Sequence, residues 1–196
     1  TITTGAGNDT ISSSDGNDSI TTTGASISII NSGAGDDTVV FGGQGSVQTG
    51  DGNDTVTGAS TTSIIDLGIG NNSLTMTDGS NTITAGVGND TVAAMGTGSN
   101  SIAVGDGINT VSSGSGADSI TTGVGADSIS AGNGANVISA GDGANSVLAG
   151  TGNDTISTGV NADTIDAGIG NNVISAGAGN NTITVSGAGG TDTITS

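Results

Sequence analysis

The chain lacks most of the chemically versatile amino acids. Its 196 residues include no Lys, Arg, His, Cys, Pro, Trp or Tyr and a single Phe, and all 18 acidic residues are Asp, so the formal net charge is −18. A nucleic-acid-binding protein uses cations to replace the counterions of the phosphates, and an anionic membrane surface repels a chain of this charge. We therefore expect neither nucleic acid nor a membrane as a partner.

Catalysis would have few side chains to draw on. Without His, Cys, Lys or Tyr, acid–base or nucleophilic steps would fall to Asp, Ser and Thr. A pair of carboxylates could still react, but the Asp residues recur along the chain, whereas an active site occurs once. The composition therefore argues against an enzyme. No stretch has the pattern of a signal peptide or a membrane span, and disulfides do not hold the fold because Cys is absent.

An aliphatic residue recurs about every nine residues and gives the chain an internal period. Irregular steps fall at 29–39, 39–47, 92–102 and 183–194, whereas the steps from Ile102 to Ile183 are all nine residues long. Because the chain starts and stops within a repeat, we interpret residues 1–196 as one repeat domain cut from a longer protein. The 22 marker residues are Ile2, Ile11, Ile20, Ile29, Val39, Val47, Val56, Ile65, Leu74, Ile83, Val92, Ile102, Val111, Ile120, Ile129, Ile138, Val147, Ile156, Ile165, Ile174, Ile183 and Ile194.

The repeat has the consensus G-x-G-(N/A)-(D/N)-(T/S)-U-(S/T)-(A/T), in which U is the marker. The segments 114–120 and 150–156 are clear copies. The paired glycines allow backbone conformations that a Cβ forbids, as a tight turn requires. The β-branched residues favour a short strand, in which the marker points inward and its two neighbours point outward.

This pattern resembles the RTX (repeat-in-toxin) calcium-binding repeat, G-G-x-G-x-D-x-U-x, over nearly the whole chain. Thr, Ser or Ala usually replaces the first Gly, as at Thr122, Ala131 and Ala140, and Asn often replaces the Asp. The resemblance implies an all-β, right-handed parallel β-roll, a β-helix solenoid with two nonapeptides per coil and calcium between successive turns. Such a chain would have about 11 coils and, at about 4.8 Å per coil, a length of about 50 Å.

The resemblance places the calcium ligands two residues before each marker, where Asp carboxylates would join backbone carbonyls of the turns. The expected ligands are Asp9, Asp18, Asp37, Asp54, Asp90, Asp118, Asp127, Asp154, Asp163 and Asp192. If repeats alternate between two sheets, this position forms a ladder on each edge. The first ladder reads Asp18, Asp37, Asp54, Asn72, Asp90, Asn109, Asp127, Asn145, Asp163, Asn181. The second reads Asp9, Ile27, Gly45, Ser63, Asn81, Asn100, Asp118, Asn136, Asp154, Asn172, Asp192.

Asp and Asn alternate along the regular part of both ladders, so the repeat is better described as 36 residues. Carboxylates on adjacent coils, about 5 Å apart, would repel by roughly 1–3 kcal/mol, and an intervening Asn doubles that distance to about a Debye length. We hypothesise weaker calcium sites than in an all-Asp roll. The alternative is that stacked Asn and Asp side chains hydrogen-bond from turn to turn, with calcium at only some positions.

Several acids lie outside the ladders. One group falls between the two turn glycines on the first edge, where it would either supplement calcium binding or form solvated loop tips: Asp15, Asp51, Asp106 and Asp142. We expect the remaining three to be surface charges: Asp66, Asp78 and Asp166.

The second inward position of each repeat, two residues after the marker, is usually Ala, Ser or Thr. We expect the larger residues at this position to fill the core: Phe41, Leu67, Met76, Val104 and Val185. Outward positions are mainly Thr and Ser, with aliphatic exceptions on one sheet at Ile30, Ile64, Val137 and Val173. These exceptions indicate either a lateral contact or scattered exposure.

The leading functional hypothesis is a calcium-stabilised structural rod of a secreted or cell-surface protein: a surface layer, an adhesin stalk or an extracellular filament, assembling with copies of itself laterally or end to end. Its thin core favours folding coupled to metal binding. The resemblance also implies type I secretion, with folding outside the cell. The alternative is a module that assists secretion and folding of an exported toxin or enzyme. Ice binding is a third possibility, but the outward rows mix Ser, Thr, Val, Ala and Asp.

Overall fold

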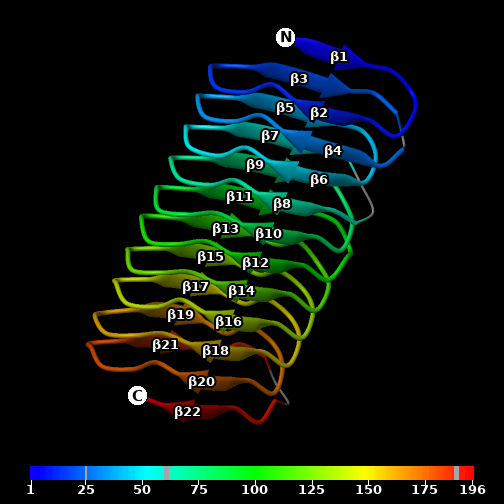
Figure 1. The fold of residues 1–196 in the computed structure, drawn as a ribbon. Coiled ribbons are helices and arrows are strands. Elements are labelled where there is room, and N and C mark those ends of the chain that lie inside the picture. Colours follow the sequence, from blue (N-terminus) through cyan, green and yellow to red (C-terminus); the bar gives the residue numbers. More distant parts are fainter. Residues whose placement is uncertain (25, 60–61, 188–189) are drawn as a thin grey trace.

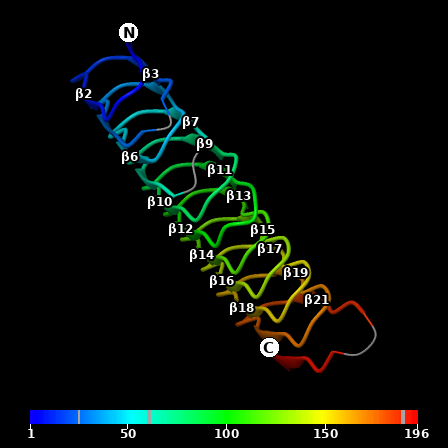
Figure 2. The same cartoon turned by 90° about the vertical axis from the view of Figure 1, so that its right-hand side faces the viewer.

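Twenty-two short strands stack into a two-sided solenoid (Figure 1). The computed structural model describes residues 1–24, 26–59, 62–187 and 190–196, and within these ranges it contains no helix. The same part of the chain accordingly offers no helix long and apolar enough to cross a membrane. Figure 2 shows a slender rod with the two termini at opposite ends.

The strands divide by number into two parallel sheets, so the chain changes sheet with every repeat. Sheet A contains β1 (Ile2–Thr4), β3 (Ser19–Thr22), β5 (Thr38–Phe41), β7 (Thr55–Gly58), β9 (Ser73–Met76), β11 (Thr91–Ala94), β13 (Thr110–Ser112), β15 (Ser128–Ser130), β17 (Ser146–Leu148), β19 (Thr164–Asp166) and β21 (Thr182–Thr184). Sheet B contains β2 (Thr10–Ser12), β4 (Ser28–Asn31), β6 (Gly45–Gln48), β8 (Ile64–Asp66), β10 (Thr82–Thr84), β12 (Ser101–Ala103), β14 (Ser119–Thr121), β16 (Val137–Ser139), β18 (Thr155–Ser157), β20 (Val173–Ser175) and β22 (Thr193–Thr195). The expected all-β roll with two repeats per coil is confirmed.

The core is a stack of marker side chains from successive coils. In sheet A, for example, Val92 pairs with Leu74 on one side and with Val111 on the other, and all three side chains are buried. Such aliphatic burial contributes about 25 cal/mol per Å² of apolar surface removed from water. Because the core is only one coil wide, each coil gains this energy mainly from its two neighbours.

The second inward position combines small residues with buried hydroxyls that find partners in the next coil. Thr122 Oγ1 donates a hydrogen bond to the carbonyl of Ala140 at 2.9 Å, and Ser113 Oγ donates to that of Ala131 at 3.0 Å. The predicted larger core residues at this position are confirmed as buried at Phe41, Leu67, Met76 and Val104.

The prediction for Val185 is wrong, because its side chain is 41% exposed. Val185 follows β21, which is the last strand of sheet A, so no further strand of that sheet covers it.

The register of β4 differs by one residue from the register expected from the sequence. Ile30 pairs with Ile11 and Val47 and is 1% exposed, whereas Ile29 is 53% exposed and points outward. The inward marker is therefore Ile30, and the expected outward direction of Ile30 was wrong. With this register Ser32 lies inside, where its hydroxyl donates to the carbonyl of Thr49 at 3.3 Å. The other register would bury Asn31, whose amide would need several hydrogen-bond partners.

The glycines of the turns let successive coils stack closely. Gly134 has a φ of 130°, which disfavours other residues. A Cβ at Gly134 would also collide with the carbonyl oxygen of Gly116 in the preceding coil. The same residue therefore satisfies two constraints, one on the turn and one on the distance between coils.

Phe41 fills a part of the interior that other coils fill with ladder side chains. Its ring lies against Gly45 and Gly58, and a Cβ at either glycine would collide with it. A Cβ at Gly58 would also lie 2.6 Å from Met76 Sδ. The interior near β5 to β9 is therefore packed with apolar side chains across both sheets.

We expect Phe41→Ala to destabilise the rod by roughly 3–5 kcal/mol, because it removes a buried ring and leaves a cavity that the glycine backbone cannot fill. Thermal unfolding followed by circular dichroism in excess calcium measures this loss. The matched control is Val40→Ala in the same strand, since the Val40 side chain is 40% exposed and points outward. Equal effects of the two substitutions would contradict the packing role of Phe41.

Candidate metal-binding edges

The solenoid has two edges formed by the turns between the sheets. We call the turns that lead from sheet B into sheet A the first edge and those that lead from sheet A into sheet B the second edge; they lie on the left and right of Figure 1. On both edges the Gly-rich turns present backbone carbonyls next to the ladder position, two residues before the inward marker.

The ladder position forms a continuous chain of hydrogen bonds along the first edge. The backbone N–H of Asn109 donates to Oδ1 of Asp127 at 2.8 Å, and the N–H of Asp127 donates to Oδ1 of Asn145 at 3.0 Å. We call this chain the inner ladder. The structure thus brings the predicted first-edge residues into one row, in the order Asp18, Asp37, Asp54, Asn72, Asp90, Asn109, Asp127, Asn145, Asp163 and Asn181.

The second edge has the same ladder over its C-terminal half. The N–H of Asn100 donates to Oδ1 of Asp118 at 2.7 Å, and the pattern continues through Asn136, Asp154, Asn172 and Asp192. The turn-to-turn hydrogen bonding that the sequence offered as an alternative therefore occurs on both edges.

Seven of the expected ligands share an unusual environment. Their side chains are buried, and their second carboxylate oxygen, Oδ2, has no hydrogen-bond partner: Asp37, Asp54, Asp90, Asp118, Asp127, Asp154 and Asp163. The other three expected ligands are only partly buried: Asp9, Asp18 and Asp192. Asp9 Oδ2 accepts a hydrogen bond from the Thr4 hydroxyl at 2.7 Å.

A buried carboxylate oxygen without a partner is costly, because burial removes the water that would solvate its charge. A bound cation or a proton would remove that cost. Among the described residues, no three carboxylates gather closely enough to hold a metal ion by themselves. A cation at these positions would therefore combine one or two Asp oxygens with backbone carbonyls, which is a ligand set that suits calcium.

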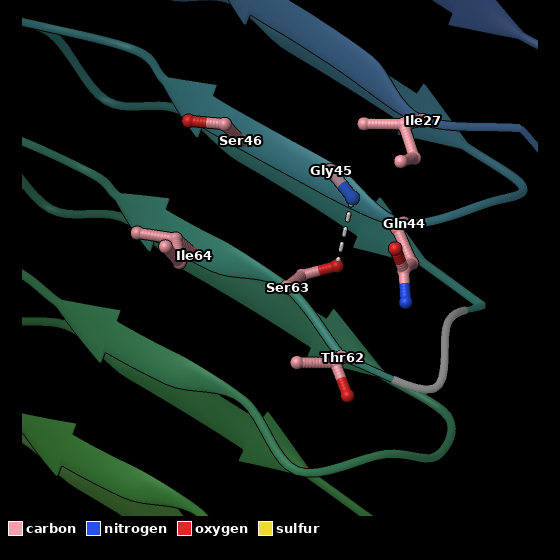
Figure 3. Close-up of a pocket in the computed structure, with 7 residues that line it drawn as sticks. All are labelled: Ile27, Gln44, Gly45, Ser46, Thr62, Ser63 and Ile64. Atoms are coloured by element: carbon pink, nitrogen blue, oxygen red, sulfur yellow. Dashed lines mark hydrogen bonds between the residues drawn. The ribbon is translucent and has the colours of Figure 1, made fainter. Parts of the chain in front are cut away.

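The second edge carries no acid in its ladder between Asp9 and Asp118. Because Ile30 is the inward marker of β4, the ladder residue of that coil is the buried Ser28. The prediction that Ile27 occupies the ladder was wrong, since its side chain is exposed. The next coils place Gly45, Ser63, Asn81 and Asn100 in the ladder, and Ser63 Oγ accepts from the Gly45 N–H at 3.0 Å (Figure 3).

A shallow apolar hollow lies on the outer face of sheet B at this acid-free part of the ladder (Figure 3). Its lining residues are Ile27, Gln44, Gly45, Ser46, Thr62, Ser63 and Ile64. Exposed aliphatic side chains occur on the outer face of sheet B at Ile29, Ile64, Val137 and Val173.

A second hydrogen-bonded row, which was not predicted from the sequence, lies outside the inner ladder. The N–H of Asn53 donates to Asp36 Oδ1 at 2.8 Å, and the N–H of Asn71 donates to Asn53 Oδ1 at 2.9 Å. Here each oxygen accepts from the following coil, whereas in the inner ladder it accepts from the preceding coil. The signal was the Asn or Asp that directly precedes the ladder residue at Asn17, Asp36, Asn53, Asn71 and Asn89.

The acids between the turn glycines bond to the neighbouring coil. Asp106 Oδ1 accepts from the Val124 N–H at 2.7 Å, and Asp142 Oδ1 accepts from the Val160 N–H at 2.9 Å. They are exposed, like the equivalent Asp15 and Asp51. The remaining acids bond within or near their own turns, with Asp66 and Asp78 exposed and Asp166 half-buried.

Burial raises the pKa of Asp54, Asp90 and Asp154 above the ordinary value of an Asp carboxyl, and the backbone N–H donated to each of them lowers it by less. For Asp54, the charges of Asp37 and Asp36 raise the pKa further. In the metal-free chain these carboxyls therefore favour protonation more strongly when the chain is folded.

The metal-free protein should become less stable as the pH rises. A carboxyl whose pKa is raised in the folded state stabilises the fold below its unfolded pKa, and that contribution disappears as the pH passes through the folded pKa. We expect the unfolding free energy of the chelated protein, measured by urea titration, to fall from about pH 4 upward. The variant Asp54→Asn, Asp90→Asn, Asp154→Asn should show a flatter profile.

General charge repulsion would act in the same direction, so a control with the same charge change is needed. Substituting the exposed Asp15, Asp51 and Asp142 with Asn removes three charges without changing the inner ladder. A profile that this control flattens as much as the ladder variant does would show that repulsion dominates. A metal-free stability that rises with pH would contradict the prediction.

Comparison with known proteins finds one family, whose nonapeptide repeat agrees with the two repeats per coil of the solenoid. The model of the RTX calcium-binding nonapeptide repeat matches residues 1–24, 22–46, 66–95, 96–129, 121–156, 148–183 and 157–194. No curated protein and no solved structure shows a significant match. The matches cover most of the chain, on both edges of the solenoid, and the chain therefore belongs to the family of RTX calcium-binding nonapeptide repeats.

Proposed function

We propose that the chain is a rod whose Asp-bearing turns bind calcium ions and are stabilised by them, in a protein that works outside the cell. The observation that carries this proposal is the set of seven buried Asp residues whose second oxygen has no partner. A divalent cation at each position would compensate that oxygen and reduce a net charge of −18 that has no basic side chain to oppose it.

Calcium suits these positions better than other common metals. All available ligands are oxygens, from carboxylates and backbone carbonyls, and the chain has no His or Cys. Magnesium would demand near-octahedral geometry and retain several waters, whereas calcium accepts irregular oxygen sets. The proposed ligands are the ten Asp residues of the inner ladders, with the three partly buried ones, Asp9, Asp18 and Asp192, as the most solvated sites.

We assign the rod a structural role. RTX repeats form calcium-binding structural modules, typically of secreted proteins. The stack of 22 strands in the described part of the chain has outward rows rich in Ser and Thr. A segment of a surface layer, an adhesin stalk or an extracellular filament fits this architecture, with folding after export where calcium is abundant.

Removal of calcium should unfold most of the rod at neutral pH, because buried carboxylates would lose their counter-ions and the core is thin. We expect excess chelator to abolish most of the β signal in circular dichroism, and added calcium to restore it. Magnesium at the same concentration serves as the control and should restore less. A β signal unchanged by chelator would contradict the proposal.

We further propose that copies of the chain associate laterally through sheet B. The apolar hollow and the exposed Ile27, Ile29 and Ile64 lie together on its outer face, at coils where the inner ladder carries no acid. Exposed aliphatic side chains that gather around an apolar hollow favour contact with another protein surface. Calcium would support this contact by lowering the repulsion between two acidic rods.

The variant Ile29→Thr, Ile64→Thr should remain monomeric in calcium at concentrations where the native chain associates, as measured by sedimentation velocity. Val40→Thr, Leu148→Thr is the matched control, since these exposed side chains lie on sheet A. A native chain that stays monomeric at all concentrations, or a control that weakens association equally, would refute the sheet B contact.

A further inference from the structure

We call each residue of the inner ladder a rung. Asn and Asp rungs share one backbone arrangement, but their side chains end in different atoms. In both, Oδ1 accepts the N–H of the ladder residue in the preceding coil: Asn109 from Asp90 at 2.9 Å, and Asp127 from Asn109 at 2.8 Å. The difference lies in the second atom, which is an amide nitrogen in Asn and a carboxylate oxygen in Asp.

The amide nitrogen of the Asn rungs already bonds the turn carbonyls. Asn109 Nδ2 donates to the carbonyls of Gly107 at 3.3 Å and Gly105 at 3.0 Å, two and four residues earlier in its own turn. The donation to the carbonyl two residues earlier recurs, at 3.0–3.3 Å, from Asn72, Asn81, Asn100, Asn136 and Asn145. Two Asn residues of the ladder differ: the amide nitrogen of Asn172 is buried and unpartnered, and that of Asn181 donates to the carbonyl of Ala176 at 2.9 Å.

The orientation of these amides follows from the network. Because one atom of the amide must accept the backbone N–H of the preceding coil, that atom is the oxygen. The nitrogen then necessarily faces the carbonyls. Rotating the amide by half a turn would set the nitrogen against an N–H donor and the oxygen against carbonyl oxygens.

At the Asp rungs an oxygen takes the place of that nitrogen. Asp127 Oδ2 is buried without a partner, and the carbonyls that correspond to the partners of Asn109 are those of Gly125 and Gly123. At an Asn rung the amide hydrogens, which carry partial positive charge, therefore face the turn carbonyls. At an Asp rung only a bound cation or a proton can place positive charge between the carboxylate and those carbonyls.

We infer that the Asn rungs bind no calcium, because the side-chain amide occupies the position of the ion, and that calcium fills only the Asp rungs. This inference rests on the proposed calcium function and defines which of its sites exist. It assigns between seven and ten ions to the chain: one for each of the seven Asp rungs with a buried unpartnered oxygen, and up to three for the partly buried Asp9, Asp18 and Asp192.

With ions only at Asp rungs, the calcium sites are unevenly distributed along the two edges of the rod. Three Asp rungs follow one another only at Asp18, Asp37 and Asp54 on the first edge, while the second edge has none between Asp9 and Asp118. In the C-terminal half, Asp rungs alternate with Asn rungs on both edges. Each ion there has an uncharged rung above and below it.

The number of bound ions tests the inference, measured by native mass spectrometry and isothermal titration calorimetry in saturating calcium. The variant Asn109→Asp, Asn145→Asp replaces the amides of two Asn rungs with carboxylates and should bind two ions more than the native chain. The variant Asn133→Asp, Asn180→Asp is the control: it adds the same charge at exposed positions and should leave the number unchanged. The inference would be overturned if the native chain bound more than ten calcium ions, or if the variant Asn109→Asp, Asn145→Asp bound no more ions than the native chain.

The reverse substitution keeps the test decisive if the added carboxylates impair folding. Asp127→Asn, Asp163→Asn should bind two ions fewer and retain more β signal in chelator than the native chain, because the new amides bond the turn carbonyls without metal. Loss of ions with no gain in metal-free structure would refute the role of the amide. A native chain that binds no calcium would instead refute the proposed function.

Discussion

The hydrogen bond from a backbone N–H to a side-chain oxygen of the next coil is the interaction on which the solenoid depends. Strand pairing satisfies the backbone inside the sheets, but at the turns the chain leaves the sheet and the N–H of each ladder residue needs another acceptor. A short side chain with a carbonyl-like oxygen meets that need at both edges, at 2.7–3.0 Å in nearly every coil. Asn, Asp and, at one coil, Ser can provide it.

The ladder position and the space beside it are then filled in three main ways. An Asn rung is electrically neutral, and at six of these rungs the amide nitrogen also bonds a turn carbonyl. An Asp rung is incomplete and, on our proposal, takes calcium. At Gly45 the ladder has no side chain, and the Phe41 ring from the opposite sheet fills the interior instead. The choice among these arrangements sets the charge, the metal demand and the intrinsic stability of each coil.

Much of this could be predicted from the sequence, because a period of nine residues leaves few alternatives. The strand positions, the two sheets, the ladder rows and most of the core follow from the alternation of inward and outward residues. Ile29 and Ile30 could not be distinguished, since adjacent β-branched residues fit the period equally well and only the packing of Ser28, Ser32 and Asn31 decides between them. Val185 was misplaced because its pattern is that of an interior coil, whereas its burial depends on a strand that sheet A does not have.

The roles within the ladder were harder to predict. The sequence marks Asn and Asp as alternatives at one position, and a comparison of charge predicts only that Asn weakens a calcium site. That the amide nitrogen bonds the carbonyls around the ion position depends on the direction in which the side chain enters the turn. The outer row through Asp36 and Asn53 was missed for a similar reason, since its hydrogen bonds run in the opposite direction to those of the inner ladder.

The direction of the inner ladder makes the rod chemically polar along its length. Where the inner ladder is continuous, each coil donates a backbone N–H to the following coil and accepts one from the preceding coil, so a cut between two such coils leaves unlike surfaces. The coil on the N-terminal side of the cut keeps a donor that has lost its acceptor, while the coil on the other side keeps an oxygen that water or a cation can satisfy. At the inner ladder, a structure that follows the rod would continue the row by offering acceptors and one that precedes it by offering donors, while water can satisfy either exposed group.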